Sequence, residues 1–258
     1  MKIISLVENT SGRCDVSAEH GLSLYIELAE CKILFDMGQT EAFVKNAEVL
    51  GVDLRDIDLA VLSHGHYDHG GGLSAFLEIN KKAPVYLSRY AFEDHYNGKE
   101  KYIGLDKSLQ GSARLKYVND KMDLAQGITI HTAKEVKRIR DLGAFGLTVM
   151  ENGVLTKEDF RHEIYLEIIE NERRILFSGC SHRGIMDIMD AFKPHTLIGG
   201  FHFSKIEDTA LLCEYAEYLS SFETDYYTCH CTGTAQFECM KKQMPRLEYL
   251  QAGESIVF

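Results

Sequence analysis

Four side chains that commonly bind metal ions occur within six residues of this chain: His64, His66, Asp68 and His69. They directly follow the apolar run Leu59–Leu62, which is typical of a short buried strand. Imidazole nitrogens and carboxylate oxygens are the usual ligands of zinc and similar divalent ions. A surface loop that is rich in histidine by chance is the alternative, but so many ligand types at a strand end favour a metal site.

The spacing inside this cluster indicates two ions rather than one. His64 and His66 occupy alternate positions, so their side chains point the same way on an extended segment. Asp68 and His69 lie just beyond, where the chain turns, and can face a second ion. The sequence therefore predicts a pair of cations at the end of a buried strand.

Composition and charge limit the class of protein and its partners. The 258 residues are 45% hydrophobic, which is enough for one layered α/β domain with a sizeable core. The net charge of −11 repels phosphate backbones and anionic lipids, so we expect a small-molecule substrate and neither nucleic acid nor membrane as partner. No signal peptide is visible, and the 7 cysteines are irregularly spaced, which favours a reducing cytoplasm. The oligomeric state stays open.

Hydrophobic periodicity predicts a chain that alternates between strands and helices. Strands are expected at residues 2–7, 22–28, 32–35, 59–62, 84–87, 128–131, 146–150, 164–169, 174–178, 196–198 and 226–229. Helices are expected at residues 43–50, 73–79, 185–192 and 208–219. This order suits two sheets packed face to face with helices outside. Residues from about 88 to 127 lack a clean period, and we expect an inserted loop or lid there.

Several motifs together resemble one known family. Ser63–Gly71 is similar to the H-x-H-x-D-H signature of the metallo-β-lactamase superfamily, and Ile33–Gly38 resembles its strand that ends in Asp-x-Gly. Three further segments resemble the branch of 7,8-dihydropterin-6-methyl-4-(β-D-ribofuranosyl)aminobenzene 5′-phosphate synthase-like proteins: Ser178–Ile185, Gly199–His202 and His230–Gly233. The resemblance implies a single αββα sandwich over residues 1–258, with two metal ions at one edge.

The resemblance also implies a set of ligands for these ions. By position, His64 and His66 would bind the first ion, and Asp68 and His69 the second. His230 follows a strand near the C-terminus, where the superfamily supplies its last histidine for the second ion. Zinc is the favoured metal, with manganese or iron as alternatives.

The remaining ligands are open to more than one assignment. Many members carry a bridging aspartate where this chain has Cys180, whose thiolate can bind zinc or whose thiol can simply be buried. His182 is our choice for the missing imidazole. His162 competes for that position, but its charged surroundings, Asp159–Glu163, favour a solvated side chain.

Other residues are assigned supporting positions. Asp36 is expected to orient a ligand imidazole by accepting its N–H. His202 is a candidate general acid, with an ordinary core histidine as the alternative. His95 falls in the expected lid, where a solvated loop is the simplest interpretation, and Cys231 is interpreted as a packing residue. No substrate-binding residue can be assigned.

These ligands predict a hydrolase. Two bound ions can bring the pKa of a water molecule from about 15.7 towards 7 and polarise the bond under attack, while Asp68 holds the nucleophile. Ester, thioester, lactone and phosphoester bonds all fit. The branch name implies an alternative, a transferase that condenses a dihydropterin pyrophosphate with an aminobenzene ribotide. A di-iron oxidoreductase is a further alternative, although such members have glutamate at the position of His66. A binding protein without catalysis is disfavoured, because it would not need both ions.

Overall fold

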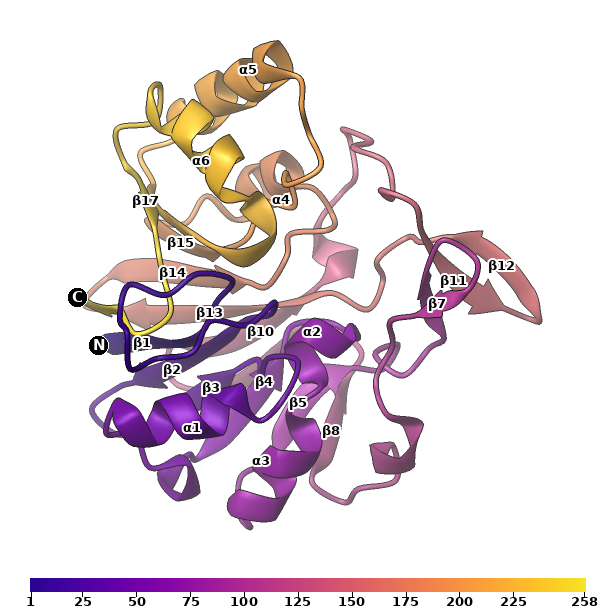
Figure 1. The fold of residues 1–258 in the computed structure, drawn as a ribbon, viewed down its shortest axis with the longest axis vertical. Coiled ribbons are helices and arrows are strands. Elements are labelled where there is room, and N and C mark those ends of the chain that lie inside the picture. The colour runs from indigo at the N-terminus through magenta and orange to yellow at the C-terminus, as the bar shows by residue number, and fades with distance from the viewer. The chain divides into compact units, whose positions relative to one another are not determined.

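The computed structural model describes residues 1–258, and they form two compact units (Figure 1). Unit 1 comprises Met1–Asn119, Gly146–Glu158 and Gln251–Phe258. Unit 2 comprises Asp120–Phe145 and Asp159–Leu250. Each unit is therefore assembled from stretches that are distant in the sequence.

The main sheet of unit 1 has seven strands in the order β18-β1-β2-β3-β4-β5-β8. Their bounds are β1 Lys2–Val7, β2 Ser23–Glu27, β3 Lys32–Phe35, β4 Leu59–Leu62, β5 Val85–Ser88, β8 Leu115–Val118 and β18 Ser255–Val257. The pairs from β18 to β3 are antiparallel, and those from β3 to β8 are parallel. Parallel strands are covered on both faces, which explains the continuous apolar run of β4.

A smaller sheet in unit 1 has four strands in the order β12-β11-β6-β7. Their bounds are β6 His95–Asn97, β7 Lys101–Tyr102, β11 Leu147–Glu151 and β12 Val154–Lys157. All its pairs are antiparallel, and β11 and β12 form a hairpin. The sheet brings residues 95–102 next to a segment that lies about 50 residues later in the chain.

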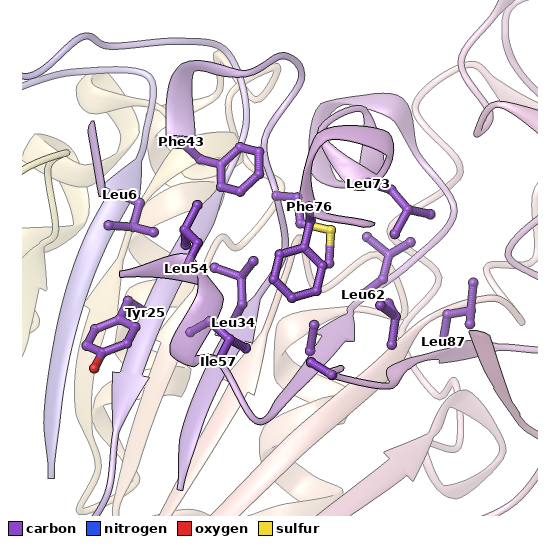
Figure 2. Packing of buried hydrophobic residues seen from close by; sticks show 14 of the residues in the cluster. Leu6, Tyr25, Leu34, Phe43, Leu54, Ile57, Leu62, Leu73, Phe76 and Leu87 are labelled. Atoms are coloured by element: carbon purple, nitrogen blue, oxygen red, sulfur yellow. The ribbon is translucent and has the colours of Figure 1, made fainter. Parts of the chain in front are cut away.

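The helices of unit 1 are short, and they cover its main sheet (Figure 1). They are α1 Ala42–Val49, α2 Tyr67–Gly70 and α3 Leu73–Ile79, with the 3₁₀ helices η1 Leu54–Asp56 and η2 Lys107–Leu109. Figure 2 shows Phe43 of α1 and Phe76 of α3 packed beside Leu34 and Leu62 of the sheet. These side chains are fully buried, so they form the centre of the apolar core of unit 1.

Unit 2 repeats this plan with a second seven-stranded sheet, in the order β17-β16-β15-β14-β13-β10-β9. Its strands are β9 Met122–Ala125, β10 Ile128–Thr132, β13 Ile164–Glu170, β14 Arg173–Ser178, β15 Thr196–Gly199, β16 Asp225–Thr228 and β17 Leu247–Tyr249. Strands β14 to β17 run parallel, so their carboxyl ends meet at one edge. The helices are α4 Ile185–Phe192, α5 Thr209–Ser220, α6 Thr234–Lys241, η3 Ala133–Glu135 and η4 His230–Thr232.

The expected elements agree with the structure where the periodicity was strong. Helices 73–79 and 185–192 are confirmed as α3 and α4. Asp208 is the N-cap of α5, and its carboxylate accepts hydrogen bonds from the backbone N–H groups of Ala210 and Leu211. The expected loop at 88–127 instead contains four short strands, β6 to β9, which join three different sheets. Its role as a lid stays a prediction. No helix combines the length and the apolar character that crossing a bilayer demands.

Candidate metal centre

Unit 1 contains four buried histidines whose rings neighbour one another in the order His69, His64, His66 and His95. We call this group the histidine row. The ring centroids are 4.1 Å apart between His69 and His64, and 4.6 Å between His64 and His66. His95 extends the row, with its ring 5.5 Å from that of His66. All four side chains are at most 4% exposed. So many polar rings are rarely buried together unless they bind something.

Asp36 holds one end of the histidine row in place. Its Oδ2 lies 2.6 Å from Nδ1 of His69, and because a carboxylate only accepts, the ring N–H donates to it. Ser63 donates to the same carboxylate from its backbone N–H and from its hydroxyl, at 2.7 Å each. The Ser63 hydroxyl also lies 2.8 Å from Nδ1 of His64. Asp36 therefore orients His69 directly, and Ser63 connects it to His64.

Gly65 is required by the close approach of another segment. A Cβ at this position would overlap the carbonyl oxygen of Ala91. A side chain would push the backbone between His64 and His66 away from Ala91, and the two rings would move with it. The glycine of this motif is therefore a packing requirement.

Asp68 lies on α2, in the turn that follows the strand end. Its carboxylate is 14% exposed and lies 3.3 Å from Nε2 of His20. The backbone carbonyl of Asp68 accepts from the Leu22 N–H. The turn thus gives His20 a partner that sequence reasoning had not assigned. The grouping of His69 with Asp68 at a separate ion stays a prediction, because the His69 ring contacts that of His64.

His95 and Glu158 form a pair that sequence reasoning missed. His95 was expected in a solvated loop, but it is fully buried, and its Nδ1 lies 2.7 Å from Oε2 of Glu158. The two residues are 63 positions apart and come together only through the small sheet. No local pattern marks them, because β6 is only three residues long and its pairing with β11 is distant in sequence.

In unit 2, three successive loops at the carboxyl ends of β14, β15 and β16 contain a non-glycine residue with positive φ. These residues are Ser181 (φ 56°), His202 (φ 57°) and His230 (φ 47°). Residues other than glycine rarely adopt a positive φ. Where they do, the segment is often part of a functional site. The carboxyl edge of parallel strands is also where α/β sheets bind ligands. The histidines predicted at these strand ends thus lie at one edge of the sheet.

Glu163 fixes the loop that carries Cys180 and His182. Its buried carboxylate accepts from the backbone N–H groups of His182 (2.7 Å) and Arg183 (3.0 Å) and from the Tyr165 hydroxyl (2.7 Å). Burial raises the pKa of Glu163, although these hydrogen bonds oppose the rise. Ser178 and Ser181 add a hydroxyl contact of 2.7 Å across the same turn. The loop is therefore held at both its ends.

The imidazoles of His182 and His202 contact each other, with ring centroids 4.3 Å apart. Phe160 stacks on His182 at 4.6 Å and lies 6.3 Å from the ring of His162. His162 is fully buried, so the expectation of a solvated side chain was wrong. Its charged neighbours in the sequence do not describe its surroundings, because the turn before β13 directs the ring inward.

Cys180, His202 and Cys231 form a second cluster in unit 2. One ligand atom of each lies within 4.8 Å of those of the other two. The Cys231 thiol donates to the backbone carbonyl of Cys180 at 3.6 Å, and a Cβ on Gly200 would overlap its sulfur. Nδ1 of His202 is buried and makes no hydrogen bond. Cys231 was interpreted as a packing residue, but the structure gives its thiol polar neighbours.

The donor set of each unit fits divalent metal ions. Unit 1 contributes the histidine row, in which the Nδ1 atoms of His69 and His95 face carboxylates, so that the Nε2 atoms carry lone pairs. Unit 2 contributes imidazoles and the buried thiols of Cys180 and Cys231. Binding of a metal by His64, His66, Asp68, His69, His182 and His230, and by Cys180 or His162, stays a prediction.

The family model of the metallo-β-lactamase superfamily matches residues 17–216. The chain belongs to this superfamily. The predicted fold class is confirmed: the chain is a mixed α/β single domain with the metallo-β-lactamase fold. The match covers most of the residues that form the two seven-stranded sheets.

Individual relatives of this superfamily member agree with the branch that the motifs indicated. The chain is 28% identical to the 7,8-dihydropterin-6-methyl-4-(β-D-ribofuranosyl)-aminobenzene-5′-phosphate synthase of Methanocaldococcus jannaschii, covering 100% of this chain and 97% of that protein. It is 30% identical to an uncharacterized protein of the same organism, over 97% and 98% of the two chains. The solved structure of Tm1679, a metal-dependent hydrolase of the β-lactamase superfamily, has a TM-score of 0.85 at 28% identity and covers 100% of this chain and 99% of its own.

Proposed function

We propose that this chain is a metal-dependent hydrolase that uses two divalent ions, zinc being favoured, to attack an ester, thioester, lactone or phosphoester bond with water. The observation that carries the proposal is the histidine row with Asp36 bonded to its end. Membership of the metallo-β-lactamase superfamily and similarity to a solved metal-dependent hydrolase support it.

In this proposal the ligands are His64, His66, Asp68, His69, His182 and His230, with Cys180 or His162 as alternatives. The bound ions would supply Lewis acidity towards the scissile group and would acidify a water molecule. Asp36 keeps His69 in the tautomer that a ligand needs, and Glu163 holds the backbone at His182.

The protein's own groups would manage the proton that leaves the nucleophile. Asp68 is partly accessible and can accept and orient a water hydrogen. His202 is the proposed general acid for the leaving group. Its ring contacts that of His182, and the residue is partly exposed, as contact with a substrate would require.

Metal analysis of the purified protein tests this proposal first. Turnover of chromogenic phosphodiesters, thioesters and lactones is then measured with and without a chelator. We expect bound divalent metal and activity that is lost with chelator and in the variants His66→Ala and Asp68→Ala. The exposed residue His195 provides a matched control, because His195→Ala removes an imidazole outside either cluster. Full activity in metal-free protein, or in His66→Ala, would refute the assignment.

A transferase is the second candidate, and the synthase of M. jannaschii favours it. That protein matches the chain over nearly the whole length of both. The same ions would then activate a pyrophosphate leaving group on a dihydropterin, and the aminobenzene ribotide would attack in place of water. Release of pyrophosphate that requires both substrates would identify this reaction. Hydrolysis of simple chromogenic esters with no such release would exclude it.

A further inference from the structure

The two ends of the histidine row have the same construction. At one end, Nδ1 of His69 lies 2.6 Å from the buried carboxylate of Asp36. At the other end, Nδ1 of His95 lies 2.7 Å from the buried carboxylate of Glu158. His69 belongs to the H-x-H-x-D-H signature and His95 does not, yet the second pair reproduces the geometry of the first.

The four-stranded sheet of unit 1 brings His95 and Glu158 together. Val149 of β11 is the register partner of His95, which fixes the position of the imidazole along β6. The β11–β12 hairpin returns the chain to the same place, where the Glu158 N–H donates to the Leu147 carbonyl. Residues from two distant stretches are thus aligned so that one carboxylate meets one imidazole.

A purely structural function does not account for this pair. His95 is fully buried and Glu158 is 1% exposed, so both groups have lost their hydration. Buried pairs of this kind contribute little stability, because desolvation offsets their attraction, and apolar residues would pack as well. In metal sites, by contrast, a carboxylate commonly accepts the N–H of a ligand histidine, which fixes its tautomer and raises its basicity.

The position of the His95 imidazole is consistent with a ligand of a metal ion bound at His66. Ligand atoms of His66, His95 and Glu158 lie within 4.8 Å of one another. The bonded Nδ1 leaves Nε2 of His95 with the lone pair, as in the other histidines that bind metal through this nitrogen.

We propose that His95 is an additional ligand of the metal centre, next to His66, and that Glu158 is the positioning residue that fixes its tautomer. The inference rests on the proposed function only in that His66 must bind a divalent ion. It extends the centre to a side chain that lies outside all the motifs of the superfamily noted above.

Metal affinity tests the inference without reference to turnover. Wild type, His95→Ala, Glu158→Gln and the control His131→Gln are titrated with Zn²⁺ against a chromophoric chelator. His131 is a matched control, because it is also a buried histidine bonded to glutamates but has no second imidazole in contact. We expect Glu158→Gln to weaken the affinity for at least one ion by about 10–100-fold, His95→Ala to weaken it at least as much, and His131→Gln to leave it unchanged.

Substitution with Co²⁺ provides a second readout. Loss of an imidazole ligand changes the d–d absorption bands, so His95→Ala should alter the spectrum of the protein loaded with Co²⁺. Glu158→Gln is nearly isosteric, and circular dichroism verifies that it folds. Unchanged Zn²⁺ affinity and an unchanged Co²⁺ spectrum in both variants would overturn the inference and leave the proposed function intact. A wild-type protein that binds no metal would instead overturn the proposed function.

Discussion

Asp36 shows how one side chain can organise several others. It adopts a positive φ of 59°, and its carboxylate accepts three hydrogen bonds within the core of unit 1. Aspartate tolerates this backbone conformation better than most residues, so the turn after β3 can direct its carboxylate towards the following strand. The Asp-x-Gly segment of the sequence therefore has a physical reason.

The substitution Asp36→Asn should disturb the metal centre, although the two side chains are nearly the same size. The new amide places a donor opposite either the His69 N–H or the Ser63 groups, so at least one hydrogen bond is lost. We expect metal affinity to fall by about 10–100-fold and the free energy of unfolding to fall by about 1–3 kcal/mol. Chelator competition and urea denaturation measure the two effects. Asp123→Asn, at an exposed position, should change neither.

The substitution Gly65→Ala tests the close approach at Ala91. The added methyl group has no space unless one of the two backbones moves, and we expect a loss of about 1–3 kcal/mol in the free energy of unfolding. Gly111→Ala is a suitable control, because no atom lies within 4 Å of the place that its added methyl group would take. Equal stability of the two variants would contradict the packing argument.

At the residue scale, candidate site residues could be predicted where they are close in sequence or belong to a recognisable motif. His64, His66, Asp68 and His69 stand together, and each lies where the strand and turn pattern placed it. His95 and Glu158 were missed because a strand of three residues has no detectable period and its partner lies far along the chain. Cys231 is buried, as expected of a packing residue, but alternation gives the direction of a side chain and not its neighbours, which here include Cys180 and His202.

At the scale of elements, the strongly periodic helices and the buried parallel strands were predicted well. Helix α3 was predicted with its observed bounds because Leu73 and Phe76 form a clear apolar face. The short antiparallel strands were missed, since their register depends on distant partners rather than on local pattern. Helix α6 was also missed, because only Met240 is buried along it.

Phe76 should be one of the larger contributors to the stability of unit 1. Its ring is fully buried between α3 and the sheet, so Phe76→Ala should cost about 3–5 kcal/mol in the free energy of unfolding (Figure 2). The neighbouring Glu78 is exposed, and Glu78→Ala should change stability by less than about 0.5 kcal/mol. Urea denaturation of both variants makes the comparison, and similar losses would show that the ring is not part of the core.

The strands β10, β13 and β14 share a titratable network. Burial alone would lower the pKa of His131, but hydrogen bonds to Glu167 and Glu135 outweigh it, and the pKa is raised. The hydrogen bond to His131, assisted by Arg174, lowers the pKa of Glu167 to about 2 against burial. The charged pair therefore stabilises the folded state across a defined range of pH.

The sign of each shift sets that range. The Glu167 contribution is present above its unfolded pKa of 4.5 and is lost as the pH falls towards about 2. The His131 contribution is complete below its unfolded pKa of 6.5 and is lost as the pH rises through the higher folded value. The difference in unfolding free energy between wild type and His131→Gln should thus be largest between these two pH values and shrink above them. A difference that does not vary with pH would contradict the assignment.

At the scale of the whole molecule, metal binding should add to stability. An ion that binds the folded chain at a free concentration of 100 times its Kd adds about 2.7 kcal/mol. For a chain of this size, removal of that ion should lower Tm by roughly 5–10 °C. Calorimetric scans with and without chelator measure the shift. Equal Tm values would argue against a centre of this affinity.

The pairing of β1 with β18 has a consequence for synthesis on the ribosome. The backbone of Lys2 lies opposite Val257, and the Phe258 N–H donates to the Met1 carbonyl. Strand β1 thus cannot gain one of its two neighbours until the chain has been translated as far as β18. Such non-local pairing slows folding and leaves an unpaired strand edge exposed to association with other nascent chains. A translation pause or a chaperone that shields this edge should therefore increase the yield of native protein.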